Sequence, residues 1–207
     1  MGTKGFLGTR LSCIDRLDDP DVKHPEMWAI GCIAKVKAHD KTISSSEALR
    51  MTPQRPVHFA GSALDGYRHV CAFFHTQDEE YRVLLPFIKE GIDRGEKAFH
   101  IVDPKLREDH LCRIRLAGID VASAEQRGQL EVKRWEETYL RGGHFDQDAM
   151  LALVQEVLNS GPARGYTLTR FVAHMAWALE DRPGVDDLVE YETRLNYILP
   201  KYNDVVV

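Results

Sequence analysis

The 207-residue sequence contains no long apolar run, no paired-cysteine motif and no signal-peptide core. No stretch approaches the roughly 18–20 apolar residues that a membrane-spanning helix needs, so we expect no integral membrane protein and no membrane partner. The N-terminus lacks the apolar region of a secretory signal. Four cysteines occur without a C-x-x-C pair, which argues against a zinc ribbon and a disulfide framework. We therefore expect a soluble cytoplasmic protein.

The common catalytic and phosphate-binding motifs are also missing. There is no G-x-S-x-G elbow, and the nine histidines show no H-x-H, H-E-x-x-H or H-x-x-x-H spacing. The turn where a P-loop would lie reads FHTQDEE (74–80), without glycine or lysine and with acids that would repel a phosphate. These absences predict no enzyme, no Walker A ATP hydrolysis, no cofactor and no metal. A metal site built from the distant His75, Asp103 and His174 has little support.

Positive charge is scarce in the main part of the chain. Residues 1–60 carry a net charge of +2, and the remaining 147 residues carry −7. Nucleic-acid binding requires clustered cations, so we expect no direct nucleic-acid partner. The simplest interpretation of the acidic body is that its charge maintains solubility.

The first sixty residues have little regular pattern. They combine four prolines with a run of three serines, and no pair of amphipathic helices flanks a glycine-containing turn as in a helix-turn-helix. We therefore divide the chain into a weakly ordered extension (1–60) and one folded domain (61–207).

From about residue 67 the pattern becomes regular. Short apolar runs predict strands at 67–74, 98–102, 130–135, 167–174 and 204–207. Amphipathic stretches between them predict helices, with a Thr76/Glu79 capping box, an Asp103 cap before Pro104, a Ser123 cap and a stop at Gly161. Alternating strands and helices indicate an α/β fold, with a mostly parallel sheet covered by helices on both faces.

Ligands of such sheets bind beyond the carboxyl ends of the strands. This rule selects seven residues in four strand-end loops: His75, Thr76, Asp103, Trp135, Glu136, Met175 and Trp177. A pocket with two indoles, a thioether and a few polar groups suits a small apolar molecule with one polar handle.

Each of these residues also has a structural interpretation. Asp103 is most simply a helix cap, the two tryptophans are core aromatics, and His75 is a loop residue. Outside this set, His100 and His174 are expected to be hydrogen-bonded core histidines. Cys71 is expected to be buried in its strand, where a thiol is inert.

Several long motifs resemble one known family. These are RHVCAFFHTQDEEYRVLLPFIKEGIDRGEKAFHIVDP (68–104), GQLEVKRWEETYLRGGHFDQDAML (128–151), HMAWALEDRPGVDDLVEYETRLN (174–196) and the closing LPKYNDVVV. They resemble the MEDS family, whose members include the sensory domain of the dichloromethane-responsive repressor DcmR. The resemblance extends over residues 67–207.

The resemblance implies a RecA/KaiC-like core without a working P-loop, which senses small organic, hydrocarbon-derived ligands. It implies a transcription factor or histidine kinase as the regulatory protein partner. Marked positions of the family fall on His69, Asp103, Trp135, Glu136, Trp177 and on the helix with Glu190, Glu192 and Asn196. His69 thereby joins the candidate ligand-binding residues, although the strand-end rule did not select it. Ala176 stands where relatives often carry an acid, and relatives continue beyond the point where this sequence ends.

Four functions follow from these observations. The first is a non-catalytic sensory domain for signal transduction, which binds a small organic ligand and passes the signal to its partner. A homodimer is one of the assemblies that this function leaves open. The second is a degenerate RecA-like domain that binds a nucleotide without hydrolysing it. The third is a small-molecule enzyme using His75, Asp103 and Glu136, and the fourth is a truncated interaction module.

Overall fold

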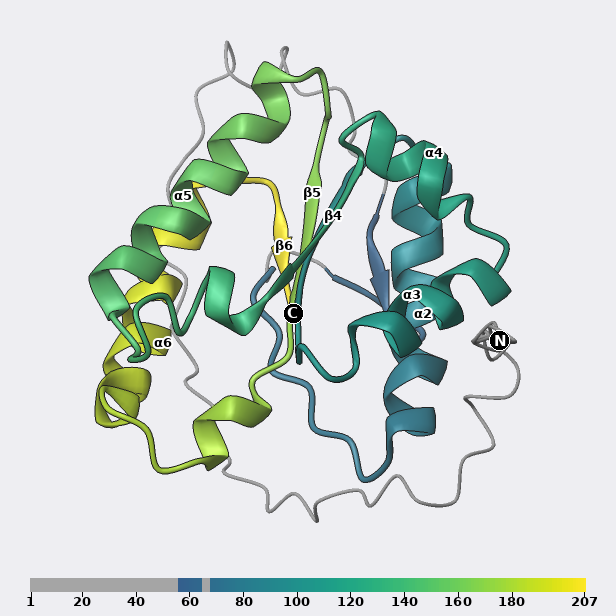
Figure 1. Ribbon diagram of the computed structural model, residues 1–207. Helices are drawn as coiled ribbons and strands as arrows, with labels where there is room; N and C mark the ends of the chain where they lie inside the picture. Colours follow the sequence, from purple (N-terminus) through teal and green to yellow (C-terminus); the bar gives the residue numbers. More distant parts are fainter. Residues whose placement is uncertain (1–55, 65–67) are drawn as a thin grey trace, which may run out of the picture.

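A parallel sheet stands between two layers of helices in the computed structural model, which describes residues 56–64 and 68–207 (Figure 1). The helices of one layer are α2 (Gln77–Asp93), α3 (Arg107–Leu116) and α4 (Val121–Gln126). Those of the other layer are α5 (Gln147–Ala163) and α6 (Leu188–Ile198). The predicted α/β class, with helices on both faces of a parallel sheet, is confirmed.

The sheet has four strands in the order β4-β3-β5-β6. Their bounds are β3 (Lys97–Val102), β4 (Leu130–Arg134), β5 (Thr169–Ala173) and β6 (Val205–Val206). Phe99 of β3 pairs with Phe171 of β5, which pairs in turn with Val206 of β6. An isolated parallel bridge between His69 and Val206 continues this row. The segment around His69 therefore forms an outer margin of the sheet, level with the middle of the strands.

Burial along the strands reflects their positions in the sheet. All six residues of β3 are buried, as expected of a central parallel strand covered on both faces. The edge strand β4 instead alternates between buried and partly exposed residues. Continuous and alternating patterns of burial thus separate the centre of the sheet from its edge.

Side-chain caps fix the starts of two long helices. The Thr76 hydroxyl accepts a hydrogen bond from the Glu79 N–H (3.1 Å), which confirms the predicted start of α2. The Glu79 carboxylate accepts from the His75 N–H (2.9 Å) and not from the Thr76 N–H that the predicted box requires. At α5, the Asp146 carboxylate accepts from the Ala149 N–H (3.0 Å).

The first predicted strand, at 67–74, is wrong as an element. Of its described residues, only His69 makes a β-bridge. The neighbouring strand β6 offers just Val205 and Val206 as partners, so the apolar run finds no longer ladder. Cys71, expected to be buried in this strand, is exposed.

Two predicted helix starts are also wrong. The Asp103 carboxylate accepts from the Lys105 N–H (2.8 Å) and closes a turn, so α3 begins only at Arg107. The cap of α4 is Asp120, which accepts from the Ser123 N–H (3.0 Å), and not Ser123 itself. In both places an aspartate binds the backbone two or three residues ahead, as short acidic side chains do. The α5 helix also passes the predicted stop at Gly161 by two residues.

A short hairpin of β1 (His58–Phe59) and β2 (Ser62–Ala63) packs against α2. Phe59 is buried and meets Phe87 edge to face, with ring centroids 5.5 Å apart. Residues 1–55, most of the predicted extension, lie outside the described residues. The division near residue 60 stays a prediction.

Each face of the sheet has its own hydrophobic core, one beneath α2, α3 and α4 and the other beneath α5 and α6. Among the described residues, no helix is both long enough and apolar enough to cross a membrane.

The strand order also has a functional consequence. The chain passes from β3 to β4 on one side and then crosses to β5 on the other, and parallel sheets hold their ligands at such reversals.

Candidate functional site

Two of the predicted strand-end loops are joined by a tryptophan. The Trp135 indole N–H, just after β4, donates to the His174 carbonyl just after β5 (2.9 Å). Trp135 is buried, and the half-buried Met175 packs in the same core. The structure therefore brings together Trp135, Met175 and the loop that leads to Trp177.

Trp177 lies in the short η2 helix (Ala176–Leu179), within a cluster of aromatic side chains that we call the aromatic group. The aromatic group consists of Tyr139, Phe145, Trp177 and Tyr191. The Trp177 ring centroid lies 5.0 Å from that of Tyr139 and 5.1 Å from that of Phe145. Burial raises the pKa of the Tyr139 and Tyr191 hydroxyls, so both stay neutral.

The Trp177 indole has an unusual environment. Its side chain is fully buried, and its Nε1 has no hydrogen-bond partner among the residues that the structure describes. Buried donors nearly always find an acceptor, and an unmet donor costs about 1–3 kcal/mol. Trp177 therefore presents a donor that a ligand with a hydrogen-bond acceptor would satisfy.

Other predicted residues serve local structure. His75 and Thr76 are exposed at the start of α2, and the half-buried Asp103 closes the turn before α3. Glu136 is exposed in the short η1 helix (Trp135–Glu137). Within the described residues, no ring contact joins any of these four to Trp177.

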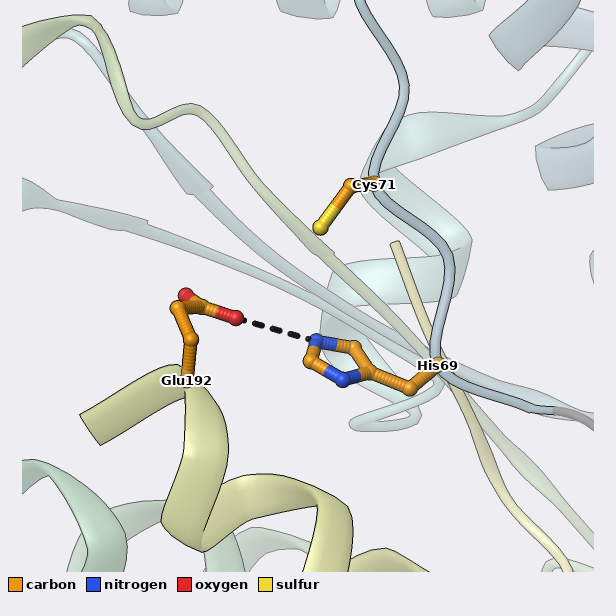
Figure 2. Close-up of side chains that lie close together, drawn as sticks. All are labelled: His69, Cys71 and Glu192. Atoms are coloured by element: carbon orange, nitrogen blue, oxygen red, sulfur yellow. Dashed lines mark ion pairs between the residues drawn. The ribbon is translucent and has the colours of Figure 1, made fainter. Parts of the chain in front are cut away.

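His69 lies at a different place from the strand-end loops. It extends from the sheet margin toward α6, where its Nδ1 lies 3.0 Å from Asn196 Oδ1 and its Nε2 lies 3.3 Å from Glu192 Oε2. Figure 2 shows the His69–Glu192 pair, with the Cys71 thiol directed toward the same space. Three marked positions of the resemblance, His69, Glu192 and Asn196, thus meet across more than 120 residues of sequence.

The polar contacts of His69 change its pKa more than its burial does. Burial by itself lowers the pKa of His69, but the hydrogen bonds to Glu192 and Asn196 and the negative charge of Glu192 raise it further than burial lowers it. The net result is a pKa above the ordinary value for histidine. His69 side-chain exposure is 16% and that of Glu192 is 32%, so the pair is reached from solvent without being fully hydrated.

A second polar cluster, built from His100, His110 and His174, lies on the opposite face of the sheet. His100 Nδ1 is 2.9 Å from His110 Nε2, and the Tyr81 hydroxyl is 2.8 Å from His110 Nδ1. His174 Nε2 is 2.9 Å from Glu80 Oε1. His100 is fully buried and hydrogen-bonded, as expected, whereas His174 is only partly buried.

Sequence reasoning missed part of each cluster. Tyr139, Phe145 and Tyr191 come from three separate segments, and no local pattern connects them to Trp177. The strand-like composition of residues 67–74 predicts a buried and inert Cys71, whereas the thiol is exposed. The spacing His-x-Cys at 69–71 is the one local signal, since alternate side chains of an extended chain share a face.

The fold and these clusters describe a parallel α/β domain with a buried aromatic group next to a polar edge site. The family model for MEDS, the MEthanogen/methylotroph, DcmR Sensory domain, matches residues 68–207. The match covers more than half of the chain, so the chain belongs to the MEDS family of sensory domains. No curated protein and no solved structure matched the sequence.

Proposed function

We propose that this domain is a non-catalytic, cytoplasmic sensor of a small organic, hydrocarbon-derived molecule. Membership of a family of sensory domains supports the general role. In this proposal the ligand binds at the aromatic group, and the signal passes to a transcription factor or a histidine kinase. The RecA/KaiC-like descent of the fold stays a prediction.

The unsatisfied indole N–H of Trp177 is the observation from which we infer the chemical class of the ligand. The Trp177 indole is buried beside the rings of Tyr139 and Phe145 and its N–H is unmet, which favours a compact apolar molecule with one hydrogen-bond acceptor. A ligand without an acceptor would leave the N–H unmet and gain less from the same burial. Small alcohols, ketones and related oxygenated hydrocarbons meet this description.

The position of the aromatic group suggests how binding is relayed. Trp177 is fully buried, so a ligand must displace η2 or α6 to reach it. The α6 helix contributes Tyr191 to the aromatic group and Glu192 to His69 at the sheet margin. Its outer side exposes Val189 and Tyr197, which we assign to the partner contact. Movement of α6 would therefore connect ligand, sheet margin and partner.

A nucleotide is the less favoured ligand. The first turn of α2 carries Asp78, Glu79 and Glu80 at the place where a helix would otherwise receive a phosphate. Micromolar binding of ATP or a cyclic nucleotide, measured by isothermal titration, would reverse this preference.

Thermal shift with a panel of small oxygenated and unfunctionalised hydrocarbons tests the proposal. We expect an oxygenated member to raise the melting temperature of the wild-type chain. We expect the Trp177→Phe variant, which keeps an aromatic ring but loses the N–H, to lose most of that shift. Tyr197→Phe, which keeps an exposed ring and loses only its hydroxyl, is the matched control, since no partner protein is present in this measurement. Equal shifts in wild type and Trp177→Phe, or no shift with any compound, would contradict the proposal.

A further inference from the structure

His69, Cys71 and Glu192 form a compact cluster of three metal-ligating side chains. The ligand atoms of the three residues all lie within 4.8 Å of one another. His69 and Cys71 are two positions apart on an extended segment, and Glu192 faces them from α6 (Figure 2). The sheet margin and the helix thus place an imidazole, a thiol and a carboxylate around one point.

One of the distances in the cluster matches what a tetrahedral ion requires. Zinc bonds of 2.0–2.3 Å place neighbouring ligand atoms about 3.3–3.6 Å apart. His69 Nε2 and Glu192 Oε2 are already 3.3 Å apart. Cys71 is exposed, and its Sγ lies within 4.8 Å of both other ligand atoms, so the thiol must move closer to them to complete the set.

A neighbouring amide orients the imidazole. Asn196 donates its side-chain N–H to the Glu192 carbonyl (3.1 Å), which turns its Oδ1 toward His69 Nδ1. The His69 Nδ1–H then donates to Asn196, and Nε2 faces Glu192 and Cys71. Histidines that bind metals usually have their second nitrogen fixed by such a partner.

We propose that His69 Nε2, Cys71 Sγ and the Glu192 carboxylate bind one divalent transition-metal ion of the zinc class. Imidazole and thiolate ligands favour zinc-like ions over magnesium or calcium, which prefer oxygen alone. On binding, the Cys71 thiol and the His69 Nε2–H that bonds to Glu192 each lose a proton to solvent, and the thiolate and the neutral imidazole bond to the ion. Three protein ligands leave a fourth position open for water or a small exogenous donor.

The inference goes beyond the sensing role and does not depend on it. The metal ligands lie at the sheet margin, whereas the proposed organic ligand contacts Trp177 in the aromatic group. The two sites share α6, through Tyr191 and Glu192. A failed metal titration would therefore leave the thermal-shift test of Trp177 valid. A failed thermal-shift test would likewise leave the metal titration valid.

Metal titration of the full chain tests the proposal. Zn²⁺ affinity is measured against a chromophoric chelator, and Co²⁺ is added to separate samples as a spectroscopic probe. The variants are Cys71→Ala and Glu192→Gln, with Cys112→Ala as the control because Cys112 is a buried residue of α3, outside the cluster. Circular dichroism confirms that each variant is folded.

We expect wild type and Cys112→Ala to bind one tight equivalent of Zn²⁺. We expect Cys71→Ala and Glu192→Gln each to lose at least tenfold in affinity. Wild type loaded with Co²⁺ should show a thiolate-to-cobalt charge-transfer band that Cys71→Ala lacks. Should a variant fail to fold, the wild-type spectrum alone decides, since a cobalt complex without the thiolate band would overturn the proposal. Unchanged affinity in folded Cys71→Ala or Glu192→Gln, or no tight equivalent in wild type, would also overturn it.

Discussion

His100 Nδ1 lies 2.9 Å from His110 Nε2, and both rings are fully buried between the sheet and the helix layer of α2 and α3. The Tyr81 hydroxyl adds a contact of 2.8 Å to His110 Nδ1. A chain of donors from Tyr81 to His110 to His100 satisfies these contacts only if both imidazoles are neutral. Burial lowers the pKa of His100 to about 3, and burial with the nearby His100, His174 and Arg107 charges lowers the pKa of His110 well below its ordinary value.

These depressed pKa values predict a loss of stability in mild acid. Below the unfolded-state pKa of about 6.5, these histidines bind protons in the unfolded chain but stay unprotonated in the folded chain. The free energy of unfolding should therefore fall as pH falls from about 6.5 toward 3, by about 1.4 kcal/mol per pH unit for each ring. Urea denaturation at a series of pH values measures the slope.

Two variants separate the histidine pair from other titrating groups. His100→Leu should reduce the slope below pH 6.5 by the share of one ring, whereas His75→Gln, at an exposed position, should leave it unchanged. The raised pKa of His69 makes its contribution fall as pH rises above about 6.5 and adds no slope below that value, and His69 is present in both variants. An identical slope in wild type and His100→Leu would show that the buried pair does not govern acid stability.

Trp135→Phe should destabilise the fold through one hydrogen bond. The variant keeps an aromatic ring at the end of β4 but leaves the His174 carbonyl without its indole donor. We expect a loss of roughly 1 kcal/mol in the free energy of unfolding. Tyr166→Phe removes a peripheral bond to the Arg127 carbonyl (2.9 Å) and should change stability by less than about 0.5 kcal/mol. Equal losses would mean that Trp135 does not join the strand ends.

Arg170→Met should be far more damaging. The buried Arg170 guanidinium lies 2.6 Å from Glu96 and 3.0 Å from Glu90, and it donates to the Phe87 carbonyl (2.6 Å). Its removal leaves the nearly buried Glu96 carboxylate uncompensated, at a cost of about 3–5 kcal/mol. Arg182→Met, which breaks a surface pair with Glu180, is the control and should cost less than about 1 kcal/mol. Similar midpoints for both variants in chemical denaturation would refute this ranking.

Asn196→Ala tests how the imidazole of the metal site is oriented. The variant removes no proposed ligand but frees the His69 ring to rotate. Loss of such a supporting contact typically weakens metal binding about 10–100-fold, so we expect Zn²⁺ affinity to fall by about tenfold or more. Thr193→Ala, on an exposed side of the same helix, is the matched control. An Asn196→Ala variant that binds Zn²⁺ like wild type would show that His69 needs no such support.

The repeating strands and helices were predictable because local signals agree with the fold. The apolar run of β3 is buried along its whole length, and Thr76 and Asp146 carry the short polar side chains typical of helix caps. Predictions failed where two local signals compete. Asp103 and Pro104 resemble a helix start, yet the Asp103 carboxylate closes a turn with Lys105 first.

The candidate sites were harder to predict because their partners are remote. The strand-end rule selected Trp177, but its surroundings depend on α6 and on the segment before α5. The run around His69 has the composition of a strand, and only the short length of β6 limits it to one bridge. That difference leaves Cys71 exposed and able to face Glu192, which periodicity alone could not indicate.

The indole region of a nitrogen–proton correlation spectrum tests the sensing role most directly. The chain has three tryptophans, so three indole signals are expected, and the Trp177→Phe spectrum assigns the one of interest. On addition of the oxygenated hydrocarbon that most raises the melting temperature, we predict that the Trp177 N–H signal shifts as it gains an acceptor. The Trp135 signal, already bonded to the His174 carbonyl, should move less. A Trp177 signal that stays in place at saturating ligand would contradict the proposed sensing site.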